Sequence, residues 1–193
     1  MKQTADNKVR QGLYCSWELL QIWGLVEHDR IIHLSFDHRC HRAAAGPGIP
    51  EYVDGARKQQ LAAFLLGILQ GSLTSFPATS PFIRQATPFQ RLVWAALHRI
   101  PFAATRTYGE IAAQLGNPLL ARAVGQACNR NPLPLIIPCH RVVARSGPGG
   151  FAGGASLKKR LLAYEQGVVR GGGEILFFTT ETQRHRDFLY NTP

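Results

Sequence analysis

Residues 87–130 decide the fold of this chain and read TPFQRLVWAALHRIPFAATRTYGEIAAQLGNPLLARAVGQACNR. Thr87 and Thr107 each precede a glutamine or glutamate by three residues, which is the capping-box pattern of a helix start. Asn117 precedes a proline, another favourable combination for the first helical turn. We therefore expect helices that start after these three residues, the third of them ending at about Asn129.

The apolar residues of this stretch recur every three or four positions, as on the buried face of a helix. The second and third helices are joined by a short turn at Gly116, so they are expected to form a helix-turn-helix. Residues 131–138 contain three prolines and cannot be helical. A last helix is expected from Ser156 to about Gln166, ending at Gly167.

Before this stretch, the pattern indicates a small sheet and one helix. Apolar and aromatic residues over 13–26 and 31–36 predict two strands joined by a polar turn, and 38–50 are expected to be a loop. A helix is expected from Asp54 to Leu69, followed by a connection over 72–88. The fold class is thus an α/β domain over 1–80 and a mainly α domain over 81–170. To the extension over 171–193 we assign no function.

The charge is concentrated in the second domain. The chain of 193 residues has a net charge of +10, and residues 87–170 alone hold eleven basic and two acidic residues, a net charge of +9. Such a field attracts a polyanion, with nucleic acid first and an anionic membrane second.

No segment predicts export or membrane insertion. The longest apolar run, residues 61–69, is far shorter than the roughly 20 residues that cross a bilayer. Residues 1–12 have no apolar signal segment, so a cytoplasmic location is expected, or a nuclear one in a eukaryote. The four cysteines contain no C-x-x-C pair and indicate neither a disulfide framework nor a zinc module.

Cys139 lies in the hexapeptide PCHRVV, residues 138–143. The thiolate is the reactive form of cysteine, and we expect the neighbouring His140 and Arg141 to lower the thiol pKa. His140 can accept the thiol proton only if the chain turns here or a water bridges the two groups. The alternative is a buried structural cysteine.

Glu165 falls on the apolar side of the last helix, where a carboxylate needs a partner. It could orient His140 in a Cys-His-Glu series. It could also form an ion pair with Lys158 or another base, and the sequence leaves both alternatives open.

Arg122 is expected in about the first turn of the second helix of the helix-turn-helix, where such helices meet DNA. Its neighbours Ala121, Ala123 and Gly125 are small, which permits close approach to a groove but offers little sequence readout. Non-specific docking is therefore expected, although an exposed arginine without a role is the alternative. Further phosphate contacts are expected from Arg106, Arg130, Arg141 and Arg145.

Taken together, the segments TPFQRLVWAALHRIP, TRTYGEIA, NPLLARAVGQACNRNPLP, IIPCHRVV and LLAYEQG resemble the O6-alkylguanine-DNA alkyltransferases. The resemblance covers residues 87–167 and is most specific at PCHRVV. It implies an RNase H-like first domain and a winged-helix-like second domain. It also implies single-turnover transfer of an alkyl group from O6-alkylguanine, and from O4-alkylthymine, in duplex DNA to a cysteine.

The resemblance implies a role for each matching position. Cys139 falls on the alkyl acceptor, His140 and Glu165 on the groups that activate it, and Asn131 on the residue that braces the active-site turn. Tyr108 falls on the proton donor to the purine, and Arg122 on the side chain that replaces the extruded nucleotide in the stack. The substrate pocket would be formed by Val142, Ala152 and Pro134.

The chain also departs from the family pattern. Ala103 and Ala104 stand where members often have glycine and a polar residue, and the stretch 148–150 is short. Some members bind a structural zinc in the first domain, but Cys15, Cys40, His38 and His41 follow no standard spacing. We expect no zinc, no cofactor and a monomer.

Proteins of other classes explain fewer of these features. A cysteine hydrolase needs no helix-turn-helix, and a sequence-specific repressor has no use for PCHRVV. A catalytically inactive damage-binding relative would lack the acceptor thiol. A methyl-sensing transcriptional activator would carry a cysteine-rich module, which is not seen.

Overall fold

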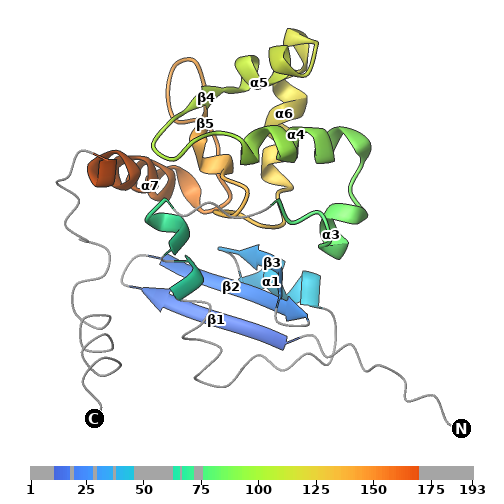
Figure 1. Ribbon diagram of the computed structural model, residues 1–193, viewed down its shortest axis with the longest axis vertical. Coiled ribbons are helices and arrows are strands. Elements are labelled where there is room, and N and C mark those ends of the chain that lie inside the picture. The colour runs from blue at the N-terminus through green and yellow to red at the C-terminus, as the bar shows by residue number, and fades with distance from the viewer. Residues whose placement is uncertain are drawn as a thin grey trace, which may run out of the picture.

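The computed structural model describes residues 11–17, 20–27, 30–36, 38–45, 63–65, 67–71 and 76–169. The first described elements are three antiparallel strands in the order β1-β2-β3 (Figure 1). These are β1 (Gln11–Trp17), β2 (Leu20–Glu27) and β3 (Arg30–Ser35).

The single strand predicted over 13–26 is wrong, because this stretch is itself a hairpin in which Trp17 pairs with Leu20. A strand of that length would exceed the usual 3 to 10 residues. Cross-strand packing of Tyr14 on Trp23, with ring centroids 5.1 Å apart, fixes the register instead.

Part of the predicted loop over 38–50 is the helix α1 (His38–Ala45). Three alanines and two arginines, both strong helix formers, outweigh the lack of a clear apolar period. The expected helix over 54–69 is helical at 63–65 and 67–69, while its Asp54 cap lies outside the described residues. The predicted connection over 72–88 contains a short helix, α3 (Pro81–Arg84).

Both capping boxes are confirmed. Thr87 caps α4 (Pro88–His98) and Thr107 caps α5 (Tyr108–Gln114), each with reciprocal bonds to the third helical residue. The turn after α5 contains the 3₁₀ helix η1 (Pro118–Leu120), which leads directly into α6 (Ala121–Asn129). The helix-turn-helix segment of residues 108–129 therefore exists, with its second helix starting three residues later than predicted.

The remaining elements bring distant segments together. Strand β4 (Arg106–Thr107) pairs in parallel with β5 (Val142–Val143), which follows the 3₁₀ turn η2 (Cys139–Arg141). Helix α7 (Gly154–Val169) continues past Gly167, so the predicted end there is wrong. The expected extension over 171–193 lies outside the described residues.

The sheet and the helical part pack on one another. Figure 1 shows the sheet below α4, α5 and α6, with β3 nearest to them. The amide of Leu34 on β3 donates to the carbonyl of Pro132 at 2.8 Å, and Ser80 Oγ donates to the carbonyl of Ile32 at 2.8 Å. A single buried apolar cluster includes residues of both parts. The expected α/β sheet followed by a mainly α region is confirmed at this level.

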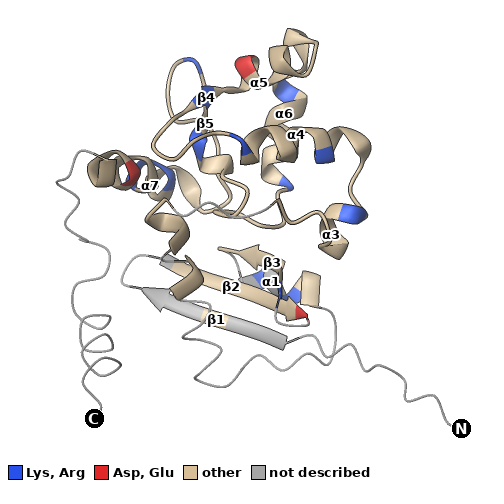
Figure 2. Ribbon diagram, viewed as in Figure 1, with Lys and Arg blue, Asp and Glu red and all other residues tan. Residues whose placement is uncertain are grey.

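Lys and Arg are spread over the helical part (Figure 2). Among the described residues, no helix is long and apolar enough to cross a bilayer.

Candidate functional site

The segment between α6 and η2 is shaped by Asn131. Its Oδ1 accepts from the amide of Leu133 at 3.0 Å, while its Nδ2 donates to the carbonyl of Ile137 at 2.7 Å. The same Nδ2 lies 3.1 Å from Cys139 Sγ. One side chain therefore holds both ends of the proline-rich turn and contacts the thiol. Leu135, in the middle of the turn, has a φ of 73°, a left-handed conformation that the surrounding bonds sustain.

Cys139 is buried at the start of η2. Burial raises the pKa of its thiol, and the hydrogen bond from Asn131 and the charge of Lys158 only partly oppose this. The expected low thiol pKa is therefore wrong: no charge of His140 or Arg141 lowers it, and His140 opposes the rise only through a backbone hydrogen bond. The resting group is a thiol, and it needs a base at the moment of reaction.

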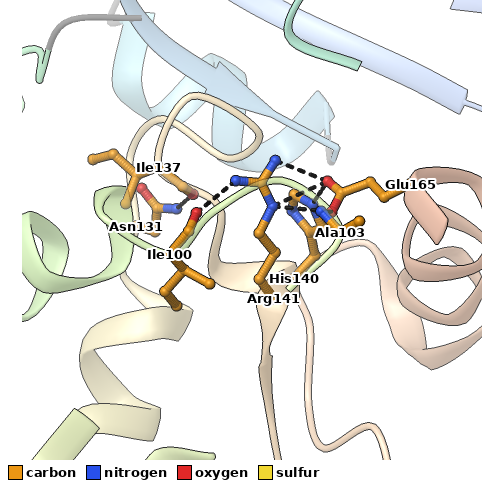
Figure 3. Close-up of polar contacts among 7 residues, drawn as sticks. All are labelled: Ile100, Ala103, Asn131, Ile137, His140, Arg141 and Glu165. Carbon is orange, nitrogen blue, oxygen red and sulfur yellow. Dashed lines mark hydrogen bonds and ion pairs between the residues drawn. The ribbon is translucent and has the colours of Figure 1, made fainter. Parts of the chain in front are cut away.

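His140 supplies a suitable base. Its Nε2 lies 2.7 Å from Glu165 Oε1, and both side chains are about 1% exposed (Figure 3). A carboxylate only accepts hydrogen bonds, so Nε2 carries the proton. Burial lowers the pKa of His140 despite the opposing effect of Glu165, so the ring is neutral near pH 7. Its buried Nδ1 then has a lone pair and no hydrogen-bond partner among the described residues.

Glu165 also binds Arg141, so it both contacts His140 and forms an ion pair with a base, although that base is not Lys158. Arg141 Nε lies 3.1 and 3.0 Å from the two carboxylate oxygens, and Nη2 lies 2.9 Å from Oε1. The amide of Ala103 donates to Oε2 at 3.0 Å. Burial alone would raise the Glu165 pKa, but the bonds and charges of His140 and Arg141 hold it below its usual range.

Arg141 is consequently a structural residue of the site. Its Nη1 donates to the carbonyl of Ile100 at 2.9 Å, so all three guanidinium nitrogens are bound to the protein (Figure 3). The residue is 8% exposed. This geometry contradicts the expectation that Arg141 contacts DNA phosphates.

Lys158 is the site residue that the sequence reasoning treated only as a possible partner of Glu165. Its ammonium is buried and donates instead to the carbonyls of Val142 and Gly150, the latter at 3.0 Å. Burial lowers the Lys158 pKa, although the nearby Cys139 and Cys128 oppose the shift. The helical spacing could have found it, since Lys158 lies seven residues before Glu165 and thus on the same inward face.

Tyr108, the first residue of α5, faces the loop over 144–150. Its hydroxyl donates to the carbonyl of Gly150 at 3.3 Å, and Lys158 Nζ lies 5.7 Å from its ring centroid. Burial is the main cause that raises the Tyr108 pKa to about 12. Gly149 has a φ of 71°, and a Cβ there would lie 2.9 Å from the Tyr108 hydroxyl. The loop can therefore approach the phenol only with glycine at this position.

The expected DNA-facing residues lie on and around α6. Arg122 and Arg130 are exposed, and Ala121, Ala123 and Gly125 are half-buried. Arg106 and Arg145 are also exposed. Because β4 pairs with β5, Arg106 on β4 lies beside Val142, which directly follows the Cys139 turn.

The three expected pocket residues differ in their surroundings. Val142 is buried and its carbonyl binds Lys158, Pro134 is buried in the turn after Asn131, and Ala152 is exposed. Val142 thus directly follows the Cys139 turn, Pro134 forms a bridge with Ile137 in the preceding turn, and Ala152 lies in a turn before α7.

Of the four candidate zinc ligands, only the side chain of Cys40 falls among those described, and it is exposed. The part of the chain that the structure describes holds no group of three His, Cys, Asp or Glu residues suited to a metal ion. The expectation of no metal stays a prediction.

Comparison with known proteins agrees with this arrangement. Residues 88–167 match the family model of the 6-O-methylguanine DNA methyltransferase DNA-binding domain. A methylated-DNA–protein-cysteine methyltransferase of Methanosarcina barkeri is 43% identical over 113 residues, which cover 58% of this chain and 70% of that protein. The chain belongs to the methylated-DNA–protein-cysteine methyltransferase family.

Other members of the methylated-DNA–protein-cysteine methyltransferase family match similarly. The Methanosarcina acetivorans protein is 46% identical over 108 residues, covering 55% of this chain and 65% of its own. The chain thus spans somewhat under two thirds of that relative's length. The crystal structure of the Mycobacterium tuberculosis O6-methylguanine methyltransferase is 31% identical with a TM-score of 0.65, covering 81% of this chain and 93% of that one. A crystal structure of Mycobacterium tuberculosis OGT in complex with DNA is also 31% identical, with a TM-score of 0.65.

Proposed function

We propose that this protein repairs DNA by moving the alkyl group of O6-alkylguanine to its own Cys139. The observation that supports this most is a pair of side-chain contacts on consecutive residues: Asn131 contacts the Cys139 thiol, and Glu165 holds the adjacent His140 as a neutral base. Family membership supplies the substrate class, since the relatives are named for methylated DNA.

The thiol proton passes to His140 Nδ1, directly or through a water, as the sulfur attacks the alkyl carbon. A carbon–sulfur bond forms and the bond between that carbon and O6 breaks. The departing guanine takes a proton from Tyr108, whose phenol is protonated at neutral pH because its pKa is about 12. A thioether is not readily displaced by water, so each molecule would act once.

The target atom lies inside the duplex, so the nucleotide must leave the stack. We propose that α6 docks in the minor groove, with Arg122 taking the vacated place and Arg106, Arg130 and Arg145 contacting phosphates. Ala121, Ala123 and Gly125 would permit the close approach. Val142, Pro134 and Ala152 would border the flipped base. O4-alkylthymine would be accepted by the same route.

The rest of the proposal concerns architecture and assembly. We propose that residues 1–80 form an RNase H-like domain and residues 81–170 a winged-helix-like domain. The partner is duplex DNA with an alkylated base, and the protein acts as a monomer without a cofactor.

Stoichiometry tests the proposed function. The protein is mixed with an excess of duplex containing O6-methylguanine, and restored guanine is quantified after digestion. One guanine per protein, formed in a single burst, is expected. Continued turnover, or restoration by a Cys139→Ser variant, would contradict the proposal.

A further inference from the structure

Leu119 is the most exposed large apolar side chain among the described residues, at 89%. It lies in η1, the turn between α5 and α6. The adjacent Leu120 packs against the apolar core instead. Of two consecutive leucines, one therefore anchors the turn while the other points into solvent.

The backbone that presents Leu119 is fixed by hydrogen bonds. Its amide donates to Asn117 Oδ1 at 3.0 Å, and the amide of Leu120 donates to the Asn117 carbonyl at 3.1 Å. The Asn117 amide in turn donates to the carbonyl of Ala112 on α5 at 3.1 Å. A partner that contacts Leu119 would thus meet a preordered backbone and incur little cost of ordering the turn.

Leu119 lies three residues before Arg122, across the junction of η1 and α6. Residues three apart on a helix are neighbours on one face, with Cβ atoms about 5–6 Å apart. Arg122 is also exposed, so an apolar and a cationic side chain lie together at the tip of the helix-turn-helix segment.

Charge indicates what covers this tip. Residues 87–170 have a net charge of +9, which repels a second copy of the same segment and attracts a polyanion. Proteins that open the minor groove often insert an apolar side chain between base steps.

We propose that Leu119 is a DNA wedge: it presses on the sugars and base edges beside Arg122 and keeps the neighbouring step open while the damaged nucleotide is extruded. This inference rests on the proposed function. It assigns Leu119 a positioning role in duplex repair, with no contact to the reacting atoms.

The test compares Leu119→Ala with wild type in single-turnover repair of an O6-methylguanine duplex and in reaction with free O6-benzylguanine. The substitution removes part of the apolar surface that Leu119 would bury against DNA. The rate of duplex repair is therefore expected to be about fivefold lower. The rate on the free base, which needs no flipping, is expected to be unchanged. The salt dependence of duplex binding should also stay the same, because no cation is removed.

The matched control is Leu92→Ala, which truncates an exposed leucine of α4 outside the helix-turn-helix segment and should repair the duplex at the wild-type rate. Leu119→Lys should steepen the salt dependence of duplex binding by about one phosphate contact, since the lysine ammonium would lie at the DNA backbone.

Equal duplex rates for Leu119→Ala and wild type would overturn the wedge while leaving alkyl transfer intact. Dimerisation of the wild type that Leu119→Ala abolishes in sedimentation would overturn it in favour of a self-association surface. Failure of the wild type on both substrates would instead refute the proposed function itself.

Discussion

Glu165 joins His140 and Arg141 in one buried network, and its carboxylate decides how His140 behaves as a base. Without the carboxylate, burial would lower the His140 pKa further, because Glu165 is the group that raises it. A weaker base would leave Cys139 as the thiol up to higher pH. The geometry therefore ties the reactivity of the sulfur to a residue 26 positions away in the chain.

Glu165→Gln is expected to slow the reaction of Cys139 with iodoacetamide at neutral pH and to shift its pH profile upward. His140→Gln should act in the same direction, and the double variant should lose little more than either single one, since members of one relay lose the same function once. Stopped reactions analysed by mass spectrometry between pH 6 and 10 would measure this. Additive losses with unshifted profiles would show that Glu165 only stabilises the fold.

Ala103 is a strained residue of the same network. It has a φ of 60°, where a residue with a Cβ is less stable than glycine by roughly 1–2 kcal/mol, and its amide binds Glu165. The departure from the family pattern at Ala103 thus places a residue with a Cβ at a backbone conformation that favours glycine.

Ala103→Gly should raise the free energy of unfolding by about 0.5–1 kcal/mol, because relief of strain exceeds the entropy that glycine adds to the unfolded chain. Urea denaturation measures the change. Ala104→Gly is the control: Ala104 does not have positive φ, so this substitution should destabilise the protein. A lower free energy of unfolding in Ala103→Gly would contradict the inferred backbone strain at Ala103.

The helices α4 and α5 begin alike but differ in what they position. Thr87 and Thr107 cap them with the same reciprocal bonds, yet α5 places Tyr108 directly after its cap, whereas α4 starts with Pro88.

Thr87→Ala and Thr107→Ala should each lower the free energy of unfolding by about 1 kcal/mol, the usual loss for a cap. Only Thr107→Ala should also slow alkyl transfer from the duplex, because it loosens the turn that holds the phenol. Paired unfolding curves and single-turnover rates check this. Equal transfer rates in the two variants would show that the α5 cap does not position Tyr108 for alkyl transfer.

These helices also show what the sequence could predict. The caps at Thr87 and Thr107 are local, so the residues themselves reveal where α4 and α5 start, whereas Asn117 caps the 3₁₀ turn η1 and α6 starts only after it. The break between β1 and β2 depends on the pairing of Tyr14 with Trp23, which no single strand pattern reveals. Likewise, the expectation that Arg141 binds DNA was wrong because the sequence does not show its ion pair with Glu165. This pair forms only when α7 packs on η2.

Across the whole molecule, the basic excess lies in the helical part that also holds Cys139 (Figure 2). Exposed arginines on and beside α6 can release counterions from DNA, whereas Arg141 cannot, because its nitrogens are bound inside the protein.

Duplex affinity should therefore fall steeply with salt and depend weakly on sequence. Arg122→Ala should slow duplex repair far more than reaction with free O6-benzylguanine. Arg99→Ala, which removes an exposed arginine outside the helix-turn-helix segment, is the control and should slow neither. Fluorescence anisotropy over a salt series, with rates on both substrates, gives these values. Equal losses on the two substrates in Arg122→Ala would contradict its place in the stack.

The most direct measurement is intact-mass analysis after incubation with a duplex that contains O6-methylguanine, followed by peptide mapping. We predict that the protein gains the mass of one methylene, located on the peptide that contains Cys139, and that Cys139→Ser gains none. An unchanged mass, or a gain located on Cys15, Cys40 or Cys128, would contradict Cys139 as the alkyl acceptor.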